Sequence, residues 1–217
     1  MLLIFDCDGV LVDSEVIACA AVSDHLALLG AAMSAAEVGE RFVGVSSKDM
    51  MAALIQQFGA RIPEDFRSAL QLRTLALLAS DLQPIPGVRM AIEALPHRRC
   101  VASSSTIERI SLSLATARLA DLFEPAHIFS SYMVKHGKPA PDIFLHAARE
   151  MQTQPGECVV IEDSVAGVTG ASAAGMRVIG FTGGSHLVDK SAHAEKLRAA
   201  GAHIVIDDMR DLAAHVG

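Results

Sequence analysis

Residues 2–9 of this 217-residue chain read Leu-Leu-Ile-Phe-Asp-Cys-Asp-Gly. The apolar run at 2–5 predicts a buried strand, and Asp6 and Asp8 follow it. Side chains two apart in extended chain point the same way, so both carboxylates aim beyond the strand's carboxyl end, where ligands bind in open α/β sheets. A plain turn also accommodates aspartates. However, two close like charges are unfavourable without a cation, so the pair favours a metal site.

Similar apolar runs recur along the chain, separated by helical patterns. The expected strands are 99–102, 126–129, 158–161, 177–181 and 203–206. Helical patterns lie between most of the strands, for example at 88–95, 107–119, 143–150 and 164–174. Alternating strands and helices predict a parallel sheet that is covered on both faces. We therefore predict an α/β fold with a Rossmann-like parallel sheet core.

A long helical segment interrupts this alternation after the first strand. Its four helical patterns are 16–29, 34–42, 47–58 and 63–80. The Pro- and Gly-containing residues 83–87 then lead the chain back to the sheet. We expect a catalytic core formed by 1–14 and 83–217, and an all-helical cap domain formed by 15–82. The two adjacent crossings fit a hinge, and the insertion fits a lid.

Composition excludes several classes of function. The formal net charge of −7 argues against a broad surface for nucleic acid or anionic lipid. No apolar run approaches the length of a membrane span, and the start lacks the pattern of a signal peptide. The four cysteines form no C-x-x-C pair and fit reduced, buried side chains. We expect a cytoplasmic monomer that binds neither nucleic acid nor membranes.

A second pair of acids follows the expected strand at 158–161. Glu162 and Asp163 stand at its carboxyl end, and Asp163 or Ser164 would also serve as the N-cap of the next helix. Together with Asp6 and Asp8, the acids favour a shared site for a hard, oxygen-preferring cation such as Mg²⁺. No His or Cys cluster suggests zinc.

Two further segments carry groups that bind phosphate. Ser103 and Ser104 begin a hydroxyl-rich run before a helix, where backbone N–H groups favour anions, although an ordinary helix cap would use the same residues. Lys138 lies between Gly137 and Pro139, in a stretch that prolines hold rigid. The alternative for Lys138 is a solvated surface lysine.

These segments together resemble the four motifs of the haloacid dehalogenase superfamily. The stretch DCDGVLVDS at 6–14 resembles the first motif, Ser103 the second, Lys138 in GKPAPD the third, and the acids at 162–163 the fourth. They occur in the family's order. The helical insertion after the first motif lies where the family carries its α-helical cap.

The resemblance implies a role for each motif residue. Asp6 would be the nucleophile that forms an aspartyl-phosphate, and Asp8 would protonate the leaving oxygen and then activate water. The other implied roles are phosphoryl binding by Ser103, Ser104 and Lys138, and Mg²⁺ binding by Asp6, Asp8 (through its carbonyl) and Asp163, with Glu162 close by.

The chain is similar to the β-phosphoglucomutase and sugar-phosphate phosphatase branch of this superfamily. The mutase uses a cap histidine and a cap arginine, whereas Ala18 and Ser47 stand at those positions here. The pattern at 41–45, which includes Gly44 and Val45 as expected substrate-binding residues, resembles 6-phosphogluconate phosphatases. We therefore predict a Mg²⁺-dependent phosphatase that acts on a small phosphorylated metabolite. A phosphosugar mutase and a non-enzymatic phosphate binder are the alternatives.

Overall fold

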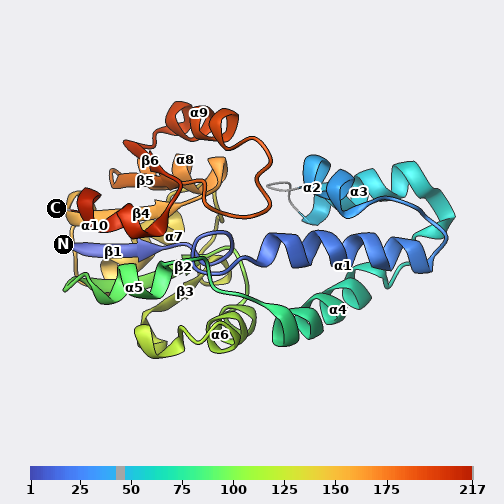
Figure 1. The fold of residues 1–217 in the computed structure, drawn as a ribbon, viewed down its shortest axis with the longest axis horizontal. Helices are drawn as coiled ribbons and strands as arrows, with labels where there is room; N and C mark the ends of the chain where they lie inside the picture. The colour runs from blue at the N-terminus through green and yellow to red at the C-terminus, as the bar shows by residue number, and fades with distance from the viewer. Residues whose placement is uncertain (43–46, 217) are drawn as a thin grey trace. The chain divides into compact units, whose positions relative to one another are not determined.

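The computed structural model describes residues 1–42 and 47–216, and of residues 47 and 48 only the backbone. The chain divides into two compact units, which are coloured by residue number in Figure 1. One unit comprises Met1–Asp13 and Gln83–Gly217, and the other comprises Ser14–Leu82.

The first unit is built on a six-stranded sheet in which every pairing is parallel. The strand order is β3-β2-β1-β4-β5-β6, so β1 lies in the middle with β2 and β4 beside it. This arrangement confirms the predicted α/β fold. The strands are β1 (Leu2–Phe5), β2 (Arg98–Ser103), β3 (Ile128–Ser130), β4 (Cys158–Glu162), β5 (Arg177–Phe181) and β6 (Ile204–Ile206).

Helices connect these strands and bury the faces of the sheet. They are α5 (Val88–Glu93), α6 (Ile107–Thr116), α7 (Asp142–Glu150), α8 (Val165–Ala173), α9 (Lys190–Ala200) and α10 (Leu212–His215). Leu2 and Ile4 share one apolar cluster with residues of α7 and α8, such as Phe144 and Val168. The alternate residues Leu3 and Phe5 point to the opposite face and are also buried, which explains why β1 is uniformly apolar.

The largest differences from the predicted elements lie toward the end of the chain. Helix α9 was not predicted, because among its eleven residues only Ala194 and Leu197 are buried and the apolar periodicity is weak. The short helix α10 was not predicted either. The expected strand at 126–129 begins late, because Pro125 opens a 3₁₀ turn over Pro125–His127 and β3 starts only at Ile128.

The described part of the second unit contains four α-helices, which have a core of their own. They are α1 (Ser14–Leu28), α2 (Ala35–Phe42), α3 (Ser47–Phe58) and α4 (Phe66–Asp81). Leu26, Leu54 and Phe66 are fully buried in this core. A capping box starts α2: the Ser34 N–H donates to Glu37 Oε2 at 2.8 Å, and the Glu37 N–H donates to Ser34 Oγ at 3.2 Å.

Two general expectations concern the environment of the protein. All four cysteines are free and buried, as expected from their spacing. Within residues 1–42 and 47–216, no helix combines the length and apolar character that crossing a membrane requires.

Candidate active site

Lys138 lies at the centre of a buried group of charges at the carboxyl edge of the sheet. Its Nζ donates to Asp6 Oδ1 at 2.7 Å, to Glu162 Oε1 at 2.6 Å and to the carbonyl oxygen of Ala102 at 3.0 Å. The side chain is only 4% exposed. The interpretation as a solvated surface lysine therefore does not hold. One ammonium group ties together the ends of β1, β2 and β4.

The surroundings of Lys138 shift the protonation of the groups that it binds. Burial raises the pKa of Asp6 to about 7, and the charges of Glu162 and Asp8 act in the same direction while the Lys138 ammonium opposes them. Burial by itself lowers the pKa of Lys138, but the Asp6 and Glu162 carboxylates outweigh it and the net pKa is raised. Lys138 thus stays charged near neutral pH.

Three carboxylates at this edge form a group that fits a cation. Asp6, Glu162 and Asp163 are all buried, and one oxygen of each lies within 4.8 Å of the others. A Cβ on Gly9 would lie 2.0 Å from Asp163 Oδ2, so Asp163 occupies space that only a glycine leaves open. Carboxylate oxygens without nitrogen or sulfur suit a hard cation such as Mg²⁺. The residues predicted to bind the metal therefore fit one, apart from the side chain of Asp8, which lies outside this group.

Glu162 is fixed by contacts on both of its oxygens. While Oε1 binds Lys138, Oε2 accepts from the N–H of Ser164 at 2.8 Å and from its hydroxyl at 2.9 Å. The Ser164 hydroxyl in turn caps α8 by accepting the N–H of Gly167 at 3.0 Å. Ser164, rather than Asp163, is therefore the helix cap, and the Asp163 carboxylate contributes an oxygen to the acidic group.

Asp8 is held by two side chains that sequence reasoning missed. Ser105 Oγ donates to Asp8 Oδ2 at 2.7 Å, and an Arg109 guanidinium nitrogen donates to Asp8 Oδ1 at 3.0 Å. Arg109 lies in the first turn of α6, where a positive charge opposes the helix dipole. This unfavourable position is the feature of the sequence from which an acidic partner for Arg109 could have been predicted.

The predicted phosphate-binding residues have different surroundings. Ser103 is buried, and its hydroxyl accepts the Ser105 N–H at 3.1 Å. Ser104 is exposed, and Thr106 is the N-cap of α6. The expected substrate-binding residues Gly44 and Val45 lie outside the described residues.

A histidine from the unpredicted helix α9 also reaches the site. His193 Nε2 lies 2.6 Å from the backbone oxygen of Asp163. Because a carbonyl oxygen only accepts, Nε2 must carry the hydrogen. The contact fixes the backbone that presents Asp163. His193 and Asp163 are 30 residues apart in the chain, so no local sequence pattern predicted this contact.

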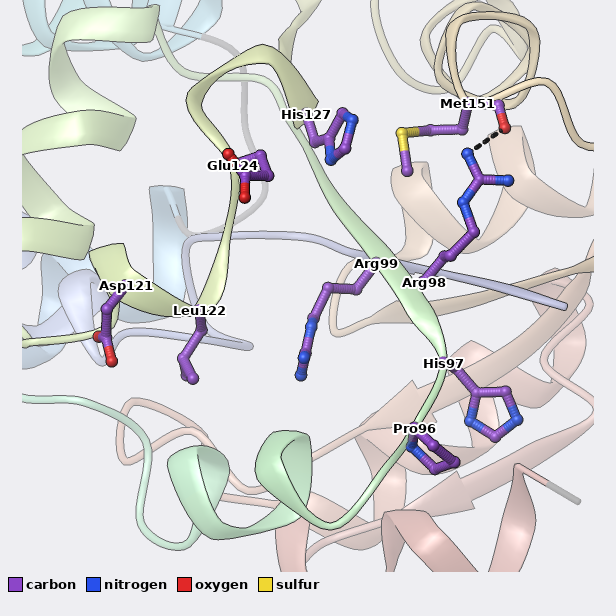
Figure 2. Close-up of a pocket in the computed structure, with 9 residues that line it drawn as sticks. All are labelled: Pro96, His97, Arg98, Arg99, Asp121, Leu122, Glu124, His127 and Met151. Carbon is purple, nitrogen blue, oxygen red and sulfur yellow. Dashed lines mark hydrogen bonds between the residues drawn. The ribbon is translucent and has the colours of Figure 1, made fainter.

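A separate pocket lies at the amino ends of β2 and β3 (Figure 2). It encloses about 350 Å³ and carries two arginines, Arg98 and Arg99, and two carboxylates, Asp121 and Glu124. Arg98 donates to the Met151 carbonyl at 2.7 Å, and Asp121 is paired with Arg89. These balanced charges contrast with the carboxyl edge, where the acids, Lys138 and Arg109 gather.

Comparisons with known proteins show which family the chain resembles along its length. The family model of haloacid dehalogenase-like hydrolases matches residues 1–175. The chain is 30% identical to the 6-phosphogluconate phosphatase of Escherichia coli K12, over 84% of this chain and 82% of that protein.

Solved structures of similar proteins share the fold over nearly the whole chain. A conserved haloacid dehalogenase-like protein of unknown function from Agrobacterium tumefaciens is 41% identical with a TM-score of 0.88, covering 98% of this chain and 96% of that one. A putative β-phosphoglucomutase from Thermotoga maritima is 25% identical with a TM-score of 0.82, covering 100% and 99%.

The space around Glu162 leads to a prediction for Gly167. A Cβ at position 167 would lie 1.7 Å from Glu162 Oε1, so we expect Gly167→Ala to displace that carboxylate and to lower the free energy of unfolding by about 1–3 kcal/mol. Urea denaturation measures the change. Gly156→Ala is the matched control, because a Cβ at position 156 would have no neighbouring atom within 4 Å. Equal stability of the two variants would contradict the close packing.

The raised pKa of Asp6 leads to a prediction about pH. Because that pKa is about 7 in the folded protein against an ordinary 3.8, the folded state keeps a proton that the unfolded chain has lost between these values. Ionisation of Asp6 therefore lowers the free energy of unfolding as the pH rises through this window. The asparagine of Asp6→Asn does not titrate, so this variant escapes that loss. With a chelator present, we therefore expect the Tm difference, Asp6→Asn minus wild type, to increase between about pH 4 and pH 7. A difference independent of pH would contradict the assignment.

Proposed function

Because the chain belongs to the haloacid dehalogenase-like hydrolase family and is a phosphatase, we propose that it hydrolyses a small phosphate monoester through an aspartyl-phosphate on Asp6. The observation that carries the proposal is the buried Lys138, bound to Asp6 at 2.7 Å and to Glu162 at 2.6 Å. An ammonium held beside a nucleophilic carboxylate is suited to binding the phosphoryl group and its developing charge.

The first step of the mechanism transfers the phosphoryl group to the protein. A carboxylate oxygen of Asp6 attacks phosphorus while the ester P–O bond breaks, and Asp8 gives a proton to the leaving oxygen. Lys138 and the segment around Ser103 hold the phosphoryl oxygens. A covalent intermediate replaces one difficult displacement by two easier ones.

The second step regenerates the protein. Asp8 takes a proton from a water molecule, whose oxygen attacks the phosphorus of the aspartyl-phosphate, and inorganic phosphate leaves as the Asp6 carboxylate is restored. Asp6, Asp163 and the backbone carbonyl of Asp8, with Glu162 beside them, would hold Mg²⁺. A bound Mg²⁺ supplies positive charge against the repulsion between the ester and Asp6.

The substrate we propose is a sugar phosphate. The relative from E. coli is a 6-phosphogluconate phosphatase, and similarity to it spans 84% of this chain. The mutase remains the second candidate because of the structural similarity to the putative β-phosphoglucomutase. Ala18 and Ser47, which replace the histidine and arginine of the mutase pattern, favour the phosphatase.

The same proposal covers the place of the protein in the cell. The free, buried thiols Cys7, Cys19, Cys100 and Cys158 suit a reducing compartment, and we assign the protein to the cytoplasm. The monomeric state and the use of residues 15–82 as a substrate-selecting cap stay predictions from the sequence.

One assay tests the reaction and its nucleophile together. With Mg²⁺ and a panel of sugar phosphates, we expect the wild type to release phosphate without forming an isomerised ester. We expect Asp6→Asn to lower the rate by at least about three orders of magnitude, because the amide cannot form the covalent intermediate. Circular dichroism checks that this variant is folded. Isomerised product without phosphate release would indicate the mutase, and full activity of Asp6→Asn would reject the covalent mechanism.

Metal binding has a test that does not depend on turnover. We expect Mg²⁺ to raise the Tm of the wild type, because a ligand that binds the folded state stabilises it. Asp163→Asn should lose most of this increase, while Glu195→Gln, an exposed carboxylate on α9, should retain it. An undiminished response of Asp163→Asn would place the metal elsewhere.

A further inference from the structure

Asp8 has an anchor on each carboxylate oxygen, and both anchors come from the segment that follows β2. Ser105 Oγ lies 2.7 Å from Oδ2, and an Arg109 nitrogen lies 3.0 Å from Oδ1. The side chains of Asp8 and Arg109 are 16% and 27% exposed. Asp8 is thus less enclosed than Lys138, and these two contacts restrain both oxygens of its carboxylate.

The two anchors are themselves fixed by other bonds. The Ser105 N–H donates to Ser103 Oγ at 3.1 Å, and the Ser105 carbonyl accepts the Ser130 hydroxyl at 2.6 Å. The Arg109 N–H donates to the cap hydroxyl of Thr106 at 3.3 Å. The backbone of both anchors is therefore held by bonds to the ends of β2 and β3 and at the start of α6 that do not involve Asp8.

We propose that Arg109 and Ser105 are positioning residues that hold the Asp8 side chain in the orientation from which it takes a proton from the attacking water. The inference rests on the proposed two-step phosphatase reaction and assigns these residues to its second step.

The chemistry of this step balances without a further reactant. The water O–H bond breaks as its proton passes to an Asp8 oxygen, and the water oxygen forms a bond to phosphorus. The bond between phosphorus and Asp6 breaks, and its electron pair returns to the Asp6 carboxylate. Arg109 and Ser105 touch none of the reacting atoms and act only through Asp8.

The second step can be separated from the first with p-nitrophenyl phosphate, whose leaving group departs readily without protonation. Loss of the anchors should slow hydrolysis of the aspartyl-phosphate and leave its formation unchanged. For Arg109→Ala we expect kcat to fall about 10- to 100-fold, as a misplaced catalytic group would cause. KM should fall by the same factor, so that kcat/KM is unchanged. Rapid mixing should show a burst of p-nitrophenolate at the wild-type rate.

Further variants separate positioning from a general effect on the fold. Arg109→Lys, which keeps the charge, should recover part of the loss, and Ser105→Ala should show the same burst with a smaller fall in kcat. Arg149→Ala is the matched control, because Arg149 is a mostly exposed arginine on α7. It should behave as the wild type does.

The outcomes distinguish this inference from the proposed function. A wild type that releases neither p-nitrophenolate nor phosphate with Mg²⁺ present would overturn the proposed function itself. An active wild type with an Arg109→Ala variant whose kcat/KM falls, or whose kcat falls without a burst, would overturn the positioning role alone. An unchanged kcat in both Arg109→Ala and Ser105→Ala would do the same.

Discussion

The site depends on burying one ammonium group between two carboxylates. Moving the Lys138 ammonium out of water is unfavourable by about several kcal/mol, because a buried ion loses its hydration. Partners for its N–H donors must offset this loss. Its bonds to Asp6, Glu162 and the Ala102 carbonyl supply those partners. All three lie at the carboxyl ends of neighbouring strands, so the parallel register that pairs Phe5 with both Val101 and Ile161 also assembles the site.

The same constraint determines where side chains must be absent. Asp163 and Glu162 can approach the centre only because Gly9 and Gly167 leave room, with 2.0 and 1.7 Å between these carboxylates and the missing Cβ positions. Gly9 also has a φ of +78°, which side chains rarely adopt. Thus the turn after β1 and the first turn of α8 are shaped by the charges that they surround.

Patterns within the chain predicted the elements that carry strong local signals. The strand at 2–5 could be predicted because a strand that is buried on both faces is uniformly apolar. The acids at 162–163 could be recognised because they directly follow such an apolar run. Helix α9 escaped notice because it buries few residues. Arg109 and Asp8 are 101 residues apart in the chain. Their contact could not be predicted from local patterns, because it forms only where the sheet brings the ends of β1 and β2 together.

Asp6 and Asp8 are two residues apart, yet their surroundings fit them for different work. Asp6 lies beside an ammonium in a buried site, where the Lys138 charge offsets part of the effect of burial and holds one carboxylate oxygen. Asp8 is more exposed and is held by a guanidinium and a hydroxyl, so it can exchange protons with water without losing its orientation. Different environments for two neighbouring carboxylates are how proteins assign them separate roles. Here the difference arises because the end of β4 and the loop at Lys138 enclose the first carboxylate, while the start of α6 holds the second.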